Sequence, residues 1–61
     1  RIWSSKDHLC FDTKPPEQID IYQINGTLVK TEHIIGSGNI ALPAGFYIVS
    51  IKNTATKIIV P

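Results

Sequence analysis

Three side chains are of the types that bind metals or act as nucleophiles and bases: His8, Cys10 and His33. His8 and Cys10 are two positions apart, so a β-strand would place them on one face, where they could share a metal ion. A structural zinc site needs four ligands, however, and the chain has no other Cys or His beyond His33. We therefore expect both histidines to be surface polar residues and Cys10 to be a small, half-buried side chain.

Nucleophilic catalysis would need a Ser or Cys beside a His that an acidic group orients. Asp7, His8 and Cys10 are close in sequence, yet neighbouring residues of a strand point to opposite faces. The glycine-rich stretch at residues 36–45 lacks both the Lys-Ser/Thr ending and the following helix of a phosphate-binding loop. The sequence accordingly predicts no catalytic residues, no metal and no cofactor, and we expect a domain that is not an enzyme.

The composition describes one small, nearly neutral domain. The chain has 61 residues, with six basic and five acidic side chains and a formal net charge of +1. This balance is not that of a nucleic-acid-binding surface, and the longest apolar run, residues 46–51, is far shorter than the roughly 20 residues of a membrane span. The single cysteine excludes an intramolecular disulfide. Since the chain begins with Arg1 rather than Met and has no signal peptide, we expect residues 1–61 to be a single domain that is a fragment of a larger protein, either excised or processed.

The chain reads as β-strands almost throughout. β-branched and aromatic residues dominate, and Gly, Pro and Asn interrupt them at short intervals. We expect seven strands, at residues 1–5, 8–13, 18–23, 27–35, 39–42, 46–53 and 56–60. Seven short strands at this spacing are typical of two packed sheets. The predicted fold class is all-β, a small seven-stranded immunoglobulin-like β-sandwich.

Residues 19–32, IDIYQINGTLVKTE, predict a β-hairpin in which Gly26 has a positive φ. A two-residue turn would set Ile19 and Ile21 opposite two charged residues of the returning strand. A three-residue loop with a bulge shifts the register by one and avoids this. We therefore predict the bulged register, whose pairs are Ile21 with Val29, Ile19 with Thr31, and Asp20 with Lys30.

Alternation along the predicted strands divides the apolar residues into two faces. The expected core comprises Leu9, Phe11, Ile19, Ile21, Val29, Ile40, Leu42, Tyr47, Val49, Ile51, Ile58 and Val60. The apolar residues that point outward are Cys10, Tyr22, Leu28, Phe46, Ile48 and Ile59. Scattered surface hydrophobes are normal, whereas a contiguous patch would mark a docking surface. Because Phe46 and Ile48 share one face of one strand, we take Tyr22, Phe46 and Ile48 as a candidate docking face.

From Ile19 onward, the order of features resembles the C-terminal sorting domains of type IX secretion cargo proteins. The residues that carry the resemblance are Ile21, Tyr22, Gly26, Leu28 and Val29, then Leu42, Pro43, Gly45, Tyr47 and Val49, then Lys57 to Val60. The resemblance covers residues 8–61 and implies that the chain is the C-terminal fragment of a larger secreted protein. It implies an immunoglobulin-like sandwich without enzymatic activity, which directs a parent protein through the periplasm and across the outer membrane to the cell surface.

The same resemblance implies partners and recognition residues. The partners would be the secretion machinery, a sortase-like peptidase that removes the domain, and a parent catalytic or adhesin domain. The recognition surface would combine the last strand with the strand beside it, and its residues are Gly45, Tyr47, Val49, Lys57, Ile58, Ile59 and Val60.

Two other functions stay open. The chain could be an accessory module that binds carbohydrate or protein through Tyr22, Phe46 and Ile48, or a structural cap packed on a preceding catalytic domain. A sandwich with a free edge and an apolar outer face also favours a homodimer, and Cys10 could join its interface.

Overall fold

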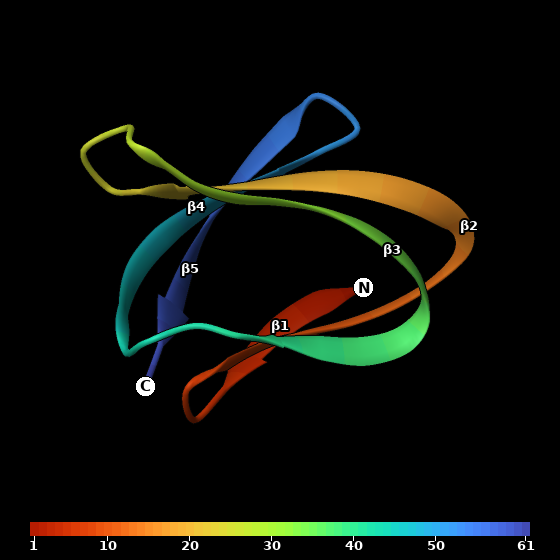
Figure 1. Cartoon of the computed structure of the whole chain (residues 1–61), viewed down its shortest axis with the longest axis horizontal. Helices are drawn as coiled ribbons and strands as arrows, with labels where there is room; N and C mark the ends of the chain where they lie inside the picture. The colour runs from red at the N-terminus through yellow and green to blue at the C-terminus, as the bar shows by residue number, and fades with distance from the viewer.

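The computed structural model describes all of residues 1–61 and contains five β-strands. The strands are β1 (Ile2–Ser5), β2 (His8–Gln23), β3 (Leu28–Ala41), β4 (Gly45–Ile51) and β5 (Thr54–Val60). All neighbours pair antiparallel in one sheet, which curls into a half-barrel (Figure 1). The predicted all-β class is confirmed. No helix of the length and apolarity that a membrane crossing requires is found.

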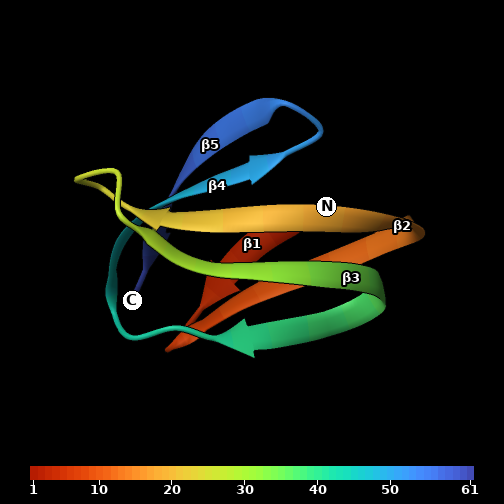
Figure 2. The same ribbon diagram turned by 45° about the horizontal axis from the view of Figure 1, so that its top comes forward.

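Strand β2 is the centre of the sheet. One of its edges pairs with β3, and its other edge pairs first with β1 and then with β4. β5 lies beyond β4. Because β2 and β3 bend together, the first half of β2 turns back over its second half, as Figures 1 and 2 show. The part of the sheet with β1 therefore faces the part with β4 and β5, and the core lies between them.

The bend in β2 lies at residues 14–16, where its pairing with β3 is interrupted. Pairing stops at Thr13 and resumes at Glu17, and the single β3 residue Ile35 spans the three unpaired residues. Two of these are prolines, which have no N–H to donate to a ladder. The hydroxyl of Thr13 donates to the carbonyl of Pro15 at 2.7 Å, which holds the bend from within.

This bend explains why five strands are present where seven were predicted. The segments predicted at residues 8–13 and 18–23 are the two halves of β2, and those at 27–35 and 39–42 correspond to the two halves of β3, which runs from Leu28 to Ala41. Prolines and glycines change the direction of the hairpin here, but its two strands pair on both sides of the bend. Breaks in the sequence pattern therefore mark a corner of one sheet rather than the ends of strands.

The register near the β2–β3 turn differs from the prediction. Ile19 and Ile21 stand opposite Glu32 and Lys30, and the bulge is at Val29 on β3 rather than in the turn. The predicted bulged register was therefore wrong. Val29 is exposed, although it was predicted as core.

Both isoleucines are nevertheless fully buried, because the other neighbour of β2 supplies their packing. On that side they pair with Ile51 and Val49 of β4. The charged residues on the β3 side, Lys30 and Glu32, lie at the open edge of the sheet. They reach solvent there and form an ion pair of 3.9 Å. A hairpin considered alone omits this second neighbour, and that omission produced the wrong register.

The core consists of nine apolar side chains: Leu9, Ile19, Ile21, Ile34, Ile40, Leu42, Tyr47, Val49 and Val60. All of them except Ile34 were predicted. Phe11, Ile51 and Ile58, also predicted, are partly buried against this core. Ile34 was missed because the bulge at Val29 shifts the alternation of β3 by one residue.

The β4–β5 turn is a two-residue turn at Lys52 and Asn53. Both residues have positive φ, 49° and 62°, as in the mirror-image turn that suits the twist of a hairpin. The bounds predicted for the last two strands were therefore wrong, since β4 ends at Ile51 and β5 begins at Thr54.

Candidate functional site

Five apolar side chains form one cluster on the outer face of the sheet, which we name the outer stripe: Tyr22, Leu28, Phe46, Ile48 and Ile59. Tyr22 on β2 pairs with Leu28 on β3 and with Ile48 on β4. Phe46 on β4 pairs with Ile59 on β5. Directly paired residues point to the same face with Cβ atoms roughly 4.5–5.5 Å apart. The outer stripe is therefore contiguous across four strands.

The outer stripe is open to solvent. Leu28 and Phe46 are each 53% exposed and Ile59 is 58% exposed, while Tyr22 and Ile48 are half-buried. These exposures are large for apolar residues that lie side by side. A contiguous apolar surface of this kind on a folded domain is typical of an interaction site.

Polar side chains border the outer stripe. On β5, the Nζ of Lys57 lies 5.5 Å from the centre of the Phe46 ring, within the range of a cation–π contact. On the opposite border, Asp20 is paired with Thr31 and with Ser50, and the hydroxyl of Thr31 donates to the carboxylate of Asp20 at 2.9 Å. An apolar centre with a polar rim is the usual anatomy of a protein interface.

The structure brings together the three residues of the candidate docking face, Tyr22, Phe46 and Ile48, and adds Leu28 and Ile59 to them. The alternation pattern had already turned both of these residues outward. The positions of Leu28 and Ile59 beside Tyr22 and Phe46 depend on which strands pair and in which register, and only the structure shows that pairing.

The seven residues predicted for recognition lie on the β4–β5 hairpin, but not on one face of it. Gly45, Tyr47, Val49, Ile58 and Val60 belong to the inner face, whereas Lys57 and Ile59 belong to the outer face. Tyr47, Val49 and Val60 are buried, and the hydroxyl of Tyr47 donates to the carbonyl of Pro43 at 2.6 Å. β4 is also paired on both edges. A partner can therefore contact outer side chains or the free edge of β5.

The three candidate ligand residues do not come together. His8 and Cys10 lie in the first half of β2, whereas His33 lies on β3 beside the second half. The Nδ1 of His8 is 2.8 Å from the carbonyl oxygen of Lys6, and the Sγ of Cys10 is 3.4 Å from the hydroxyl of Ser5. No group of three or more His, Cys, Asp or Glu side chains is arranged to hold a metal ion.

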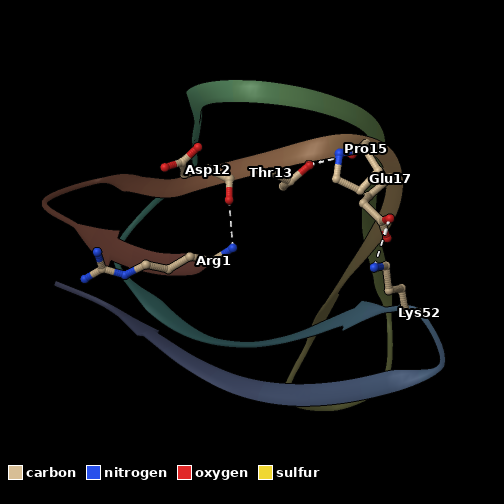
Figure 3. A network of polar contacts seen from close by, with 6 residues as sticks. All are labelled: Arg1, Asp12, Thr13, Pro15, Glu17 and Lys52. Atoms are coloured by element: carbon tan, nitrogen blue, oxygen red, sulfur yellow. Dashed lines mark hydrogen bonds and ion pairs between the residues drawn. The ribbon is translucent and has the colours of Figure 1, made fainter.

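A polar cluster lies where the bend of β2 meets the β4–β5 turn (Figure 3). The Nζ of Lys52 in the turn is 3.4 Å from the carboxylate of Glu17 just after the bend. The backbones of Arg1 and Asp12 exchange two hydrogen bonds of 2.8 Å, which extend the β1–β2 ladder by one pair. These contacts connect the start of the chain, the bent part of β2 and the β4–β5 turn. We therefore interpret the cluster as structural.

Comparisons with protein-family models, with curated proteins and with solved structures find no match to this chain.

Proposed function

We propose that this chain is a non-catalytic sorting domain, which directs a parent protein across the outer membrane to the cell surface. The type IX secretion machinery would recognise it, and a sortase-like peptidase would then remove it from the parent. In this proposal the outer stripe is the surface that the secretion machinery binds.

The contiguity of the outer stripe carries the proposal. A domain that serves only as a folded spacer has no need of apolar side chains aligned across four strands. The residues that carry the resemblance to the sorting family lie on the inner and the outer faces of the β2–β3 and β4–β5 hairpins. Their inner members, such as Ile21 and Tyr47, are buried, while Tyr22 and Leu28 lie in the outer stripe.

The proposal includes the immunoglobulin-like architecture of the sorting family. The bend divides β2 and β3 into halves, and the halves would correspond to separate strands of a two-layer sandwich. One layer would hold β1 with the first half of β2 and the second half of β3. The other layer would hold the remaining halves with β4 and β5, giving the seven segments that such a sandwich requires.

The proposal is tested by fusing residues 1–61 to the C-terminus of a periplasmic reporter. The fusion is expressed in a host with an intact type IX system and in its secretion-defective mutant. We expect the reporter on the surface of the intact host alone. Reporter that stays in the periplasm of both hosts would contradict the proposal. Deleting residues 57–61 is expected to stop delivery, but this deletion also removes the buried Val60, so stability must be measured in parallel.

A second candidate function is a binding module for a protein or carbohydrate, supported by the aromatic residues Tyr22 and Phe46 within the outer stripe. Substituting Tyr22, Phe46 and Ile48 with alanine would then weaken partner or glycan binding in a titration. Unchanged binding by the triple variant would argue against this function.

A further inference from the structure

The strands β1, β3 and β5 each pair on one side only, and the open edges of β3 and β5 differ in the side chains of their inner faces. On β3, Lys30 and Glu32 are charged residues in inner-face positions, opposite Ile21 and Ile19, and a bulge interrupts the ladder at Val29. Inward charges and bulges are devices that keep a foreign strand from adding to an edge. The inner face of β5 has Thr54, Thr56, Ile58 and Val60 instead, without a charge. The edge of β5 therefore lacks both an inward charge and a bulge, and its one charged side chain, Lys57, lies on the outer face.

The β5 edge faces β1, and the two strands meet only at one end. The hydroxyl of Ser4 donates to the carbonyl of Ile59 at 2.6 Å, and the amide of Asp7 donates to the carbonyl of Pro61 at 3.1 Å. Asp7 is in the turn after β1, and Pro61 directly follows β5. Residue numbers therefore rise together along the two segments, and β1 and β5 run in the same direction. Figure 1 shows the two strands converging toward the C-terminus and separating toward their starts.

A pocket of about 250 Å³ occupies the gap between the separated starts of β1 and β5. It is lined by Arg1, Ile2, Val49, Ile51, Thr56 and Ile58. This volume is below the roughly 300–1,000 Å³ of a typical small-molecule site, and four of its lining residues are apolar. Its size and chemistry suit side chains of a strand rather than a free ligand.

We propose that β5 accepts an extended segment of another protein, which adds as a strand beside Thr54–Ile58 and fills the gap toward β1. A segment antiparallel to β5 would also be antiparallel to β1, because those two strands run the same way. Antiparallel pairing is slightly more stable per residue than parallel pairing. Strand addition of this kind supplies affinity through main-chain hydrogen bonds and specificity through alternate side chains.

The pocket defines the chemistry of the incoming segment. Alternate residues would be β-branched and apolar, since they would pack against Ile2, Ile51 and Ile58. Arg1 is the single charged residue that lines the pocket, and no acidic residue lines it. An acidic residue at a position between the apolar ones therefore complements the site. This inference concerns the edge of β5 and goes beyond the recognition of the outer stripe.

The test uses the full 61-residue chain and a capped heptapeptide, Thr-Val-Glu-Val-Thr-Val-Thr. A control peptide of the same composition has its three valines consecutive, which removes the alternation. Binding is followed by NMR titration. We expect the alternating peptide to bind at least about tenfold more tightly than the control, with shifts at the amides of β5 and β1. Equal affinity, no binding, or shifts confined to the outer stripe would overturn the inference.

Two variants of the protein sharpen the test. Thr56→Glu places an inward charge on β5, as Glu32 does on β3, and should weaken peptide binding by about tenfold or more. Ala55→Glu adds the same charge one residue away, on the outer face, and should leave peptide binding unchanged. Both positions are exposed, and circular dichroism checks that both variants stay folded. Equal effects of the two substitutions would contradict the inference.

Sedimentation of the unliganded chain distinguishes a second copy from a foreign strand. The inference predicts an oligomeric state of the unliganded chain that Thr56→Glu does not alter. A dimer that Thr56→Glu abolishes would assign the β5 edge to self-association and overturn it. None of these measurements depends on delivery to the cell surface, so the inference and the proposed function can fail separately.

Discussion

Phe11 and Gly38 show how one residue pair shapes the curled sheet. They are partners across β2 and β3, and a Cβ atom on Gly38 would lie 2.8 Å from the Cζ of the Phe11 ring. The ring therefore occupies the space that any other side chain would need. Covering a strand glycine with an aromatic ring restores apolar contact where the glycine itself offers none.

Substituting Gly38 with alanine should destabilise the fold by about 1–3 kcal/mol, because the Phe11 ring must move out of its packed position. Urea denaturation measures this change, with Asn39→Ala as the control, since Asn39 is exposed and points to the opposite face. The double variant Gly38→Ala/Phe11→Leu should recover part of the loss. Equal stability of Gly38→Ala and the parent chain would contradict the packing described here.

Tyr47 combines a buried ring with one hydrogen bond. It is 7% exposed, and its hydroxyl donates to the carbonyl of Pro43 at 2.6 Å. Tyr47→Phe removes only this bond and should cost about 0.5–1.5 kcal/mol in thermal or chemical unfolding. Tyr22→Phe is the matched control, because the Tyr22 hydroxyl belongs to the outer stripe. A loss as large for Tyr22→Phe would show that the Pro43 contact is not the cause.

At the scale of the elements, the alternation of apolar residues predicted most of the side chains on the inner face. The others depended on which strands pair and in which register. The buried positions of β4 followed from period two alone, since Tyr47 and Val49 alternate with Phe46 and Ile48. The register of β3 could not be predicted from alternation, because no residue pattern in the sequence indicates the bulge at Val29. The burial of Ile19 and Ile21 was predicted correctly, but the register chosen to explain it was wrong.

The inward charges on β3 should act against edge-to-edge association. Replacing Lys30 and Glu32 with valine would give β3 an apolar inner face along its free edge, and we expect dimers or larger oligomers. Analytical ultracentrifugation over a range of concentrations measures this. The control is Thr31→Val/His33→Val, which adds two valines to the outer face of the same strand. Oligomers in the control alone would contradict the role assigned to the charges.

At the scale of the whole molecule, fold class was predictable and strand count was not. Composition and turn residues indicated an all-β domain, and the structure has only strands and turns. The two prolines and two glycines at the corner of β2 and β3 look like loop signals, whereas they bend a continuous hairpin. A domain of this size has a small core, and the corner lets one sheet enclose that core on two sides.

The candidate site was also only partly predictable from the sequence. Outward-facing apolar residues could be identified one strand at a time. These residues form the outer stripe because the strands lie in the order β3–β2–β4–β5 in the sheet. This order brings together residues as distant in sequence as Tyr22 and Ile59. The open edge of β5 likewise depends on the strand order, because β5 pairs with β4 alone.

The central claim is that the outer stripe is the surface by which the domain is recognised. The most direct test compares surface delivery of the reporter fusion carrying Ile59→Ser with that of the fusion carrying Ile35→Ser. The two isoleucines are 58% and 64% exposed, but only Ile59 lies in the outer stripe. Loss of the Ile59 side chain from the outer stripe should lower delivery by about tenfold, whereas the fusion carrying Ile35→Ser should be delivered normally. Equal delivery by the two stable variants would contradict the claim.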